Sequence, residues 1–311
     1  MLLEDSELPL VLPVMDDYKA RGGNAPLENA KAWVNVNVNG VNGKRETTTM
    51  PGSAGSAWYF LRYCDPRNDE KFADYDLLKY WMPVDFYMGG KEHLVGHLLY
   101  SRFWNIFLFD KGLVPNKEPF KKLFHQGMIL GEDGNKMSKS LGNVINPDDR
   151  ERDYGADGLR MYEMFMGPVA DTKPWSTANI EGIKKFIDRL HRLYFELKVI
   201  ENKPNFNLEK IYHQTVKKVG EDYETMKINT AISQMMIFVN AIYKEISEGG
   251  HFPLEYAEGF VKLLNPIIPF ITEEIWTTVL GHKGTIAYEC WPKYNESKCG
   301  EDNIEYAVQV N

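Results

Sequence analysis

A strand, a helix and a second strand follow one another closely in the first half of the chain, and this succession limits the possible folds more than any other feature. Residues 84–88 form a β-type run that ends at Gly89 and Gly90, residues 92–111 show apolar side chains at helical spacing, and residues 124–130 form another β-type run. Such a succession within about 45 residues predicts a βαβ unit of a parallel sheet. Ligands bind beyond the carboxyl ends of parallel strands, so we expect the Gly-Gly turn and the loop after the second strand to carry a site. The predicted apolar face of the helix consists of Val95, Leu98, Leu99, Phe103, Ile106 and Phe107.

Helical periodicity dominates the second half of the chain. Apolar residues recur every three or four positions across residues 176–280, and Pro204, Pro266 and Pro269 mark interruptions. We therefore predict an α/β part followed by an all-α bundle, with the boundary near residues 165–176. The expected helices cover residues 183–197, 208–226, 229–247, 254–264 and 271–280.

The composition argues against several classes of protein. A net charge of −8 disfavours a protein that coats nucleic acid by bulk charge, although phosphate contacts need only a local basic patch. Three cysteines without C-x-x-C spacing disfavour a disulfide framework and a zinc ribbon. The first residues carry acids where a signal peptide needs positive charge, and no run of about 18 apolar residues predicts a membrane span. We expect a cytoplasmic protein without a membrane partner.

Residues 1–50 lack a pattern that would give them a core of their own. Glycines and prolines punctuate the segment, and residues 34–40 alternate apolar and polar side chains before a turn signal. We interpret the segment as a connector that contains an edge hairpin.

The loop after the second predicted strand contains two lysines three residues apart, Lys136 and Lys139, with serines beside them and Gly131 and Gly134 before them. Glycines permit a mobile loop, and the two cations suit a polyphosphate. A lysine about 4 Å from a phosphate charge gains about 4 kcal/mol at an effective dielectric constant near 20. Judged by composition alone, the alternative is a solvated basic loop.

The letters K-M-S-K-S at residues 136–140 reproduce the signature of class I aminoacyl-tRNA synthetases. Further blocks on both sides of the signature are similar to the same neighbourhood in leucyl-tRNA synthetases. They are R-E-T-T-T-M at residues 45–50, S-A-W-Y-F-L-R-Y at 56–63, Y-M-G-G-K-E-H-L-V-G-H at 87–97, Q-G-M-I-L at 126–130, L-G-N-V-I-N-P at 141–147 and Y-G-A-D-G-L-R at 154–160.

The resemblance implies a fold and a set of roles. The fold is α/β plus all-α, with the second half of a Rossmann-like nucleotide-binding parallel sheet followed by an anticodon-binding-type helical bundle. Lys136 and Lys139 would be catalytic and would stabilise the pyrophosphate that leaves ATP, with Mg²⁺ sharing that charge. The residues that would bind ATP are Gly89, Gly90, Glu92, His93, Met137, Ser138 and Lys139, with Glu92 accepting hydrogen bonds from the ribose. The residues that would bind leucine are Ser56, Tyr87 and His97.

Some of these residues also have plainer interpretations. His93 and His97 share a helix face, which suits a metal or two ordinary helix histidines, but the pattern H-E-x-x-H is absent. For Trp58 and Tyr59, which lie in a block that the resemblance places at or near the leucine site, core packing is an equally good interpretation.

The bundle resembles the tRNA-contacting bundle of the same family through Trp175, the segment at residues 265–276 and Trp291. The resemblance implies contacts with the tRNA backbone and its shape rather than with the anticodon bases. The candidate contact residues are Lys184, Lys185, Arg189 and Arg192, for each of which a solvated helix face is the alternative.

The chain departs from the family in several places. No C-x-x-C pair precedes residues 45–50, so no structural zinc and no other metal site are expected. We find no H-x-G-H signature, no editing domain, no leucine-specific insertion before residues 136–140 and no C-terminal tRNA-binding domain after residue 311. We do not take the threonines of residues 47–49 for an editing site, because the family places that site earlier in its sequence.

The combined prediction is a leucine–tRNA ligase segment that activates leucine with ATP and transfers it to tRNA-Leu, and that is inactive alone. Its expected partners are tRNA-Leu, leucine, ATP and the missing N-terminal half of the enzyme, in the same chain or as a separate subunit. The alternatives are a non-catalytic tRNA-binding subunit or module of a split synthetase, and an isoleucyl- or valyl-type enzyme. The predicted domains are a connector at residues 1–50, a catalytic half at 51–170, a bundle at 171–290 and a linker at 291–311.

Overall fold

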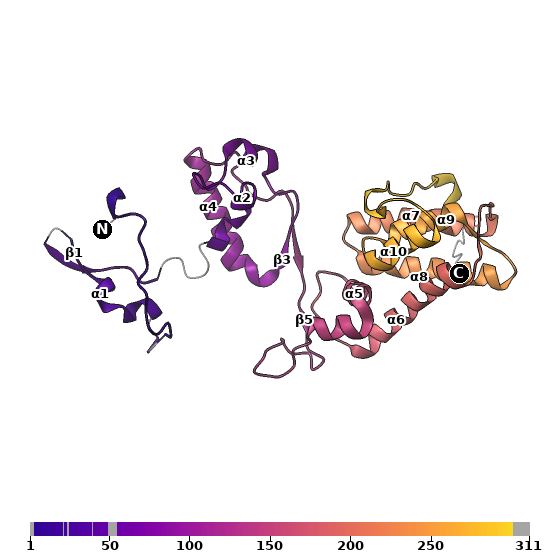
Figure 1. Cartoon of the computed structure of the whole chain (residues 1–311), viewed down its shortest axis with the longest axis horizontal. Coiled ribbons are helices and arrows are strands. Elements are labelled where there is room, and N and C mark those ends of the chain that lie inside the picture. The colour runs from indigo at the N-terminus through magenta and orange to yellow at the C-terminus, as the bar shows by residue number, and fades with distance from the viewer. Residues whose placement is uncertain (1–2, 21, 24, 39, 49–54, 301–311) are drawn as a thin grey trace, which may run out of the picture. The chain divides into compact units, whose positions relative to one another are not determined.

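The computed structural model describes residues 3–20, 22–23, 25–38, 40–48 and 55–300. The chain forms two compact units, Met1–Phe124 and His125–Asn311, and each is described by itself (Figure 1). The four-part division predicted from the sequence stays a prediction. Residues 1–2, 21, 24, 39, 49–54 and 301–311 of that division lie outside the described residues. No helix within the described ranges combines the length and apolarity that a bilayer crossing requires.

The start of the first unit contains the predicted hairpin. After short 3₁₀ turns at Asp5–Glu7 and Pro26–Asn29, helix α1 (Lys31–Val34) leads directly into β1 (Asn35–Val38). β2 (Val41–Lys44) pairs with β1 in antiparallel register. Gly40 at the turn has a φ of +84°, a conformation that glycine adopts without strain.

The rest of the first unit packs around a small apolar cluster. Its helices are α2 (Tyr59–Tyr63), α3 (Tyr75–Trp81) and α4 (Leu99–Asp110), and a 3₁₀ turn (Lys91–His93) and a π-helical turn (Leu94–Leu98) lead into α4. Asp74 caps α3 by accepting a hydrogen bond from the Asp76 amide. The cluster contains Phe60, Leu61, Ala73, Leu78, Met82 and Val114.

The predicted first strand exists but lies further along the chain than expected. β3 spans Tyr87–Gly90 and pairs with β4 (Leu123–Gln126), while Val84 forms only an isolated parallel bridge to Phe120. The predicted helix follows β3, so the strand–helix–strand order is confirmed.

The predicted strand at residues 124–130 is interrupted. Its second part is β5 (Ile129–Leu130), which pairs in parallel with β6 (Lys173–Pro174). Between β4 and β5, the Gly127 amide donates to the Val169 carbonyl, and a side chain at Gly127 would collide with the Asp171 backbone. The close approach of another backbone therefore ends the first ladder and explains the glycine.

Most of the predicted apolar face of the helix at residues 92–111 is exposed. Leu98 is buried, but Val95, Leu99, Phe103 and Phe107 are exposed. The residues that α4 buries are polar ones, Ser101 and Asn105.

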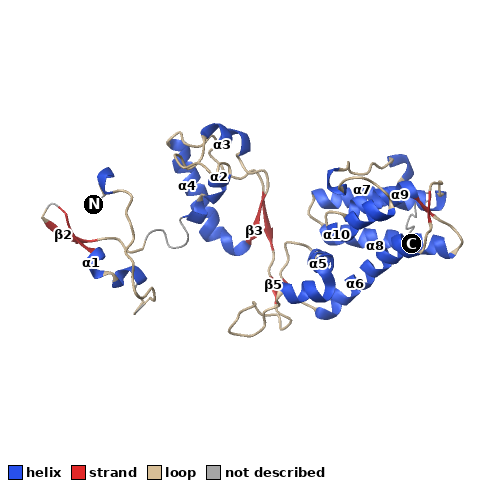
Figure 2. Cartoon of the chain, viewed as in Figure 1, coloured by secondary structure: helices blue, strands red, loops and turns tan. Residues whose placement is uncertain are grey.

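The second unit contains the predicted helical bundle, preceded by a helix that is kinked at Gly155 (Figure 2). Helix α5 (Pro147–Phe165) was not predicted, because its sequence is polar and Gly155 interrupts it with a φ of +75°. The remaining helices confirm the predicted ones, within a few residues at their ends except at the start of α6, which lies six residues before the predicted start. They are α6 (Thr177–His191), which continues as a π-helical turn (Arg192–Glu196), α7 (Phe206–Glu224), α8 (Ile228–Ser247), α9 (Leu254–Leu264) and α10 (Pro269–Glu274), which continues as a π-helical turn (Ile275–Val279).

The bundle has a continuous core of aliphatic and aromatic side chains. Phe238 of α8 lies at its centre, with its ring edge-on to Phe260 and Phe252 and tilted against Tyr212. A short parallel ladder between β7 (Ile200–Glu201) and β8 (Phe252–Pro253) joins two of the loops. Two 3₁₀ turns, Ile286–Tyr288 and Glu296–Lys298, follow α10.

Two family-like segments meet in this unit, although 106 to 114 residues separate their contacts in sequence. Asp157 of α5 accepts hydrogen bonds from the amides of Phe270 and Ile271 at the start of α10. Arg160 donates to the carbonyls of Pro266 and Ile267 just before it. These four bonds join the helix after the K-M-S-K-S loop to the bundle.

Candidate functional site

The loop that carries Lys136 and Lys139 begins directly after β5. The Gly131 amide donates to the Asn135 carbonyl at 2.9 Å, and Gly134 turns the chain with a φ of +74°. A Cβ at Gly131 would lie 2.7 Å from an Asp133 carboxylate oxygen and 3.0 Å from the Asn143 amide nitrogen, so a larger residue here would displace these two hydrogen-bonding groups.

One amide side chain, that of Asn143, holds both limbs of the loop together. Its Nδ2 donates to both carboxylate oxygens of Asp133 at 3.2 Å and to the Lys136 carbonyl at 3.4 Å, while its Oδ1 accepts from the Ser138 amide at 2.9 Å. The Ser138 and Ser140 hydroxyls form a further hydrogen bond at 2.5 Å. These hydrogen bonds give the loop a defined conformation.

The two lysines of the loop are exposed and form no ion pair with any described residue. Asp133 is the nearest acid along the chain, but its carboxylate is occupied by hydrogen bonds. The Asn135 amide, the Asn135 side chain and Asn143 lower the pKa of Asp133, which keeps it ionised as their acceptor. Lys136 and Lys139 thus present two free ammonium groups.

Met137 points in the opposite sense to the lysines and anchors the loop. It packs against the bundle core and lines a pocket of about 170 Å³ together with Ile129, Ile145, Leu159 and Trp175. Its sulfur also accepts a hydrogen bond from the Ile145 amide at 3.5 Å. The alternation of lysine, methionine and serine therefore places cations outward and an apolar anchor inward.

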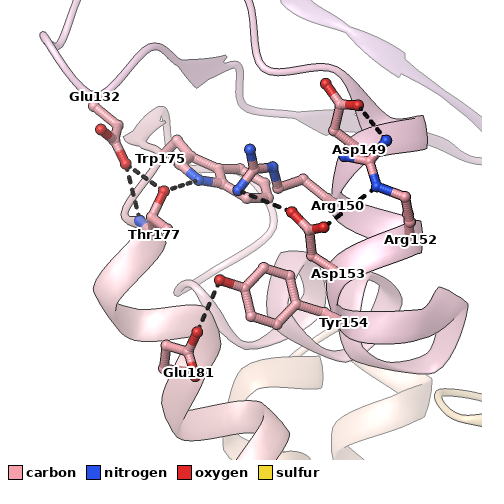
Figure 3. A network of polar contacts seen from close by, with 9 residues as sticks. All are labelled: Glu132, Asp149, Arg150, Arg152, Asp153, Tyr154, Trp175, Thr177 and Glu181. Carbon is pink, nitrogen blue, oxygen red and sulfur yellow. Dashed lines mark hydrogen bonds and ion pairs between the residues drawn. The ribbon is translucent and has the colours of Figure 1, made fainter.

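The base of the loop is bonded to the first bundle helix (Figure 3). Glu132 accepts hydrogen bonds from the Thr177 amide at 3.0 Å and from the Thr177 hydroxyl at 2.6 Å, and that hydroxyl accepts one from the Trp175 indole. Ser176 stands at the N-cap of α6 without a side-chain capping bond, so Glu132 supplies the cap from outside the helix. These bonds lower the pKa of Glu132.

A second set of contacts in Figure 3 stabilises the same region. The Tyr154 hydroxyl of α5 donates to Glu181 of α6 at 2.9 Å. Asp153 lies 4.0 Å from the Arg150 guanidinium and 3.5 Å from that of Arg152. The loop, α5 and the start of α6 are therefore joined by side-chain bonds as well as by packing.

In the first unit, the Gly-Gly turn at the end of β3 lies beside Glu92, the residue predicted to accept hydrogen bonds from the ribose. A Cβ at Gly90 would lie 2.3 Å from a carboxylate oxygen of Glu92, so glycine lets that carboxylate fold back over the turn. Glu92 and His93 are both exposed. The turn thus offers an open acid beside bare backbone, which is suited to hydroxyl groups.

The predicted leucine-binding residues Tyr87 and His97 are in direct contact. The Tyr87 hydroxyl is hydrogen-bonded to His97 Nε2 and, at 3.0 Å, to the Tyr59 hydroxyl, and its ring stacks on Phe120 with the centroids 3.9 Å apart. Burial raises the pKa of Tyr87 well above its ordinary value and lowers the pKa of His97. Both groups are therefore neutral at pH 7 and form a wall without net charge.

Only one of the other residues predicted from the block at 56–63, Tyr59, contacts Tyr87 in the described contacts. Ser56 is exposed in a 3₁₀ turn (Gly55–Ala57), and no described contact joins it to Tyr87. Trp58 packs edge-on against Phe72, in agreement with the core interpretation, whereas Tyr59 joins the Tyr87 contacts. Around His93 and His97, as elsewhere among the described residues, no three potential ligands come together for a metal ion.

Three of the four basic residues predicted to contact tRNA lie on α6, and Arg192 begins the π-helical turn that continues it. Lys184, Lys185 and Arg192 are exposed, while the Arg189 guanidinium lies 4.7 Å from the centroid of the Tyr243 ring. Sequence reasoning missed Asn143 and Glu132. The only sequence signal for Asn143 is its position shortly after the K-M-S-K-S signature. No local signal points to Glu132.

Comparison with known proteins agrees with this arrangement. Residues 67–174 match the family model described as tRNA synthetases class I (I, L, M and V), and residues 207–311 match that of the anticodon-binding domain of tRNA ligase. The chain is also similar to the crystal structure of the ternary complex of Agrobacterium radiobacter K84 agnB2 LeuRS with tRNA and LeuAMS. That match has a TM-score of 0.77 and 30% identity, and it covers 96% of this chain and 40% of the other.

A second solved structure shows a likeness of fold alone. Mycobacterium tuberculosis methionyl-tRNA synthetase, in complex with methionyl-adenylate, matches with a TM-score of 0.55 and 15% identity over 75% of this chain and 55% of its own.

The fold and the loop thus define a class I catalytic half joined to a helical anticodon-binding domain, and the predicted fold class is confirmed. The chain belongs to the class I aminoacyl-tRNA synthetases. Within that family, its predicted resemblance to the leucyl-tRNA synthetases is confirmed by the match to LeuRS, of which it spans 40% of the length.

Proposed function

We propose that the chain is a functional part of a leucine–tRNA ligase. In the reaction, a leucine carboxylate oxygen bonds to the α-phosphorus of ATP, and the bond from that phosphorus to the bridging oxygen breaks as pyrophosphate leaves. A hydroxyl at the end of tRNA-Leu then attacks the leucyl carbonyl and releases AMP. Magnesium arrives bound to ATP as part of the substrate, since Mg²⁺ is commonly held by phosphates and water.

The observation that supports this proposal most is the pair of free ammonium groups in a braced loop. Lys136 and Lys139 have no described ion-pair partner, while Asn143 and Met137 fix the backbone between them. Negative charge grows on pyrophosphate as it leaves, so preorganised cations stabilise the transition state more than the ground state. Met137 and Ser138 shape the loop, and the Ser138 hydroxyl would exchange its hydrogen bond with the Ser140 hydroxyl for one to a phosphate oxygen.

The first unit carries a proposed set of contacts of its own. Gly89 and Gly90 allow close approach of the nucleotide, Glu92 accepts hydrogen bonds from the ribose hydroxyls, and His93 lies beside the base or ribose. Tyr87 and His97 form a neutral wall for the leucine side chain, and Ser56 lies near it. The neutrality of this wall suits an apolar substrate.

The test is leucine-dependent exchange of pyrophosphate into ATP. We expect no exchange with the chain alone, and exchange when a polypeptide carrying the H-x-G-H half is added. Lys136→Ala or Lys139→Ala should lower the restored rate about 100-fold or more, as removal of a transition-state donor does. Lys283→Ala, which removes an exposed lysine of the bundle, serves as the matched control. Unchanged exchange in the loop variants would refute the role of the loop.

A second candidate function is that of a non-catalytic tRNA-binding module. The match of residues 207–311 to an anticodon-binding domain and the exposed cations of α6 favour it. Lys184, Lys185, Arg189 and Arg192 would then contact the phosphate backbone of tRNA-Leu. Filter binding of tRNA by the chain alone, with no restored exchange under any condition, would favour this function over the first.

The amino acid and the compartment are part of the proposal too. Exchange driven by isoleucine or valine but not by leucine would identify the enzyme as isoleucyl- or valyl-type. We also propose a cytoplasmic location and the absence of a structural zinc, which metal analysis of the purified protein would check.

A further inference from the structure

A small pocket lies behind the inward anchor of the K-M-S-K-S loop, within the second unit. Its volume is about 170 Å³, and apolar side chains line it together with one guanidinium and one carboxylate. The apolar side chains include those of Ile129, Met137, Ile145 and Trp175, and the charged groups belong to Arg150 and Glu163. Apolar walls with a few placed polar groups are typical of sites that bind small molecules.

The two charged residues reach the same pocket because α5 is bent between them. Arg150 and Glu163 are 13 positions apart, which would separate them by about 20 Å along a straight helix. Gly155 interrupts the helix with a φ of +75° and a ψ of 159°. A pocket as small as this one does not extend over such a length, so the kink at Gly155 gives it two opposite charges.

The Arg150 guanidinium has a buried donor without an acceptor. Its Nε is buried and has no hydrogen-bond partner among the described residues, and Asp153 lies 4.0 Å from one of its terminal nitrogens. Figure 3 shows the Arg150 side chain beside Trp175, which also lines the pocket. Buried donors in folded proteins are nearly always hydrogen-bonded, so we expect an acceptor from outside the chain at this position.

Glu163 contributes the opposite charge but does not neutralise Arg150. No ion pair within the described part of the chain includes Glu163, although its side chain and that of Arg150 line one pocket. Loss of water around the carboxylate raises the pKa of Glu163, and Arg160 offsets part of this rise. The pocket therefore keeps a cation and an anion apart, and a ligand with both charges would satisfy both groups.

We propose that this pocket is a binding site for a free amino acid with a small branched apolar side chain, of the size of valine. The Arg150 Nε donates a hydrogen bond to the ligand carboxylate, and Glu163 accepts one from the ligand ammonium group. The ligand side chain packs against Ile145 and Trp175. An apolar cavity of about 150 Å³ holds benzene, so a partly open pocket of about 170 Å³ accommodates a molecule of this size.

The site goes beyond the proposed function. Tyr87 and His97, which are assigned to the leucine substrate, belong to the other unit. The bound amino acid would instead contact Met137, the apolar anchor between Lys136 and Lys139. Occupancy of the pocket would therefore restrict the loop and make its mobility depend on the supply of amino acid.

The experiment titrates the full chain with L-valine and follows the methyl resonances of Ile129 and Ile145. Two analogues each lack one charge: 3-methylbutanoate has no ammonium group, and isobutylamine has no carboxylate. The test variants are Arg150→Met and Glu163→Gln. Arg152→Met and Glu151→Gln, which replace exposed residues of the same helix, are the matched controls. Thermal unfolding confirms that each variant is folded.

We expect L-valine to shift both resonances in a saturable manner. A hydrogen bond between charged groups corresponds to about 10- to 100-fold in Kd, so each test variant and each analogue should weaken binding by that factor. The control variants should bind as the unmodified chain does. Absence of any shift, which would indicate a pocket filled by water, would overturn the proposal. Equal binding by an analogue or a test variant, or shifts confined to the first unit, would do so too.

Amide hydrogen exchange at residues 136–140 tests the contact with Met137. With L-valine at about 10 times its Kd, amides that open only after the ligand leaves should exchange about 10-fold more slowly. Arg150→Met should show no such slowing, whereas Arg152→Met should. Binding without any slowing in the unmodified chain would refute the contact with Met137 on which the site depends. None of these measurements uses pyrophosphate exchange, so their outcome is independent of the proposed function.

Discussion

Asp157 of α5 gives the most quantitative test of how the catalytic loop region is joined to the bundle. Its two carboxylate oxygens accept hydrogen bonds from the Phe270 amide at 3.2 Å and the Ile271 amide at 2.8 Å. Pro269 is the first residue of α10, so these amides are ones that no carbonyl within the helix can reach. Asp157 therefore caps α10 from another helix, and Asp157→Ala removes that cap.

The expected loss follows from the contacts. The two bonds are part-buried, so each amide left without an acceptor costs up to about 1–3 kcal/mol, and the negative charge near a helix N-terminus contributes about 0.3–1 kcal/mol more. Burial raises the pKa of Asp157, so the charged form is partly disfavoured and its removal offsets part of the loss. We expect the free energy of unfolding of the second unit to fall by about 2–4 kcal/mol, or its Tm by roughly 5–15 °C.

The assay is urea unfolding followed by circular dichroism and by the fluorescence of the buried Trp175 and Trp276. Asp157→Asn, which keeps one acceptor, should lose about half as much as Asp157→Ala. Asp188→Ala, at an exposed position on α6, is the matched control and should unfold within about 0.5 kcal/mol of the unmodified chain. If Asp157→Ala and Asp188→Ala unfolded alike, the carboxylate would not be what joins α5 to α10.

Three further predictions concern the site. Asn143→Ala removes the amide that binds both limbs of the loop, so amide hydrogen exchange at residues 131–143 should become about 10-fold faster, and unchanged exchange would contradict the bracing role. Because its hydrogen bonds lower the pKa of Glu132, the bond to Thr177 should persist at neutral pH and be lost only as pH falls below the ordinary value of 4.5. The Thr177 amide resonance reports this loss, and Glu132→Gln should abolish the titration. Burial lowers the pKa of His97, so the stability that it contributes as a neutral group should be present above pH 6.5 and decline as pH falls below it. A His97→Gln variant whose free energy of unfolding varied with pH in the same way as that of the unmodified chain would argue against this assignment.

Much of the helical bundle was predictable from the sequence because a helix records its buried side in its own residues. The helices that were expected over residues 208–226, 229–247 and 254–264 agree closely with α7, α8 and α9. The hairpin of β1 and β2 was equally clear from alternation and a turn signal. In each of these elements, backbone geometry sets a repeat within one stretch of chain, so the pattern needs no knowledge of distant residues.

The loop of the candidate site was found by its letters, but its construction was not. Nothing near Glu132 indicates that it caps a helix 45 residues later, and nothing near Asp157 indicates α10. Helix α5 was missed because its polar sequence and Gly155 obscure the repeat. Which residues become partners of this kind depends on which distant segments pack against each other in the folded chain.

Helix α4 shows most clearly which features the sequence alone determines and which depend on the tertiary structure. The sequence by itself determined that a helix follows the Gly-Gly turn and that one of its sides is apolar. Only the tertiary structure decided that Asn105 and Ser101 face the interior and that the apolar side faces outward. Periodicity specifies the angle between the sides of a helix, whereas the direction in which each side points depends on the backbone groups and apolar surfaces that other parts of the fold bring to it.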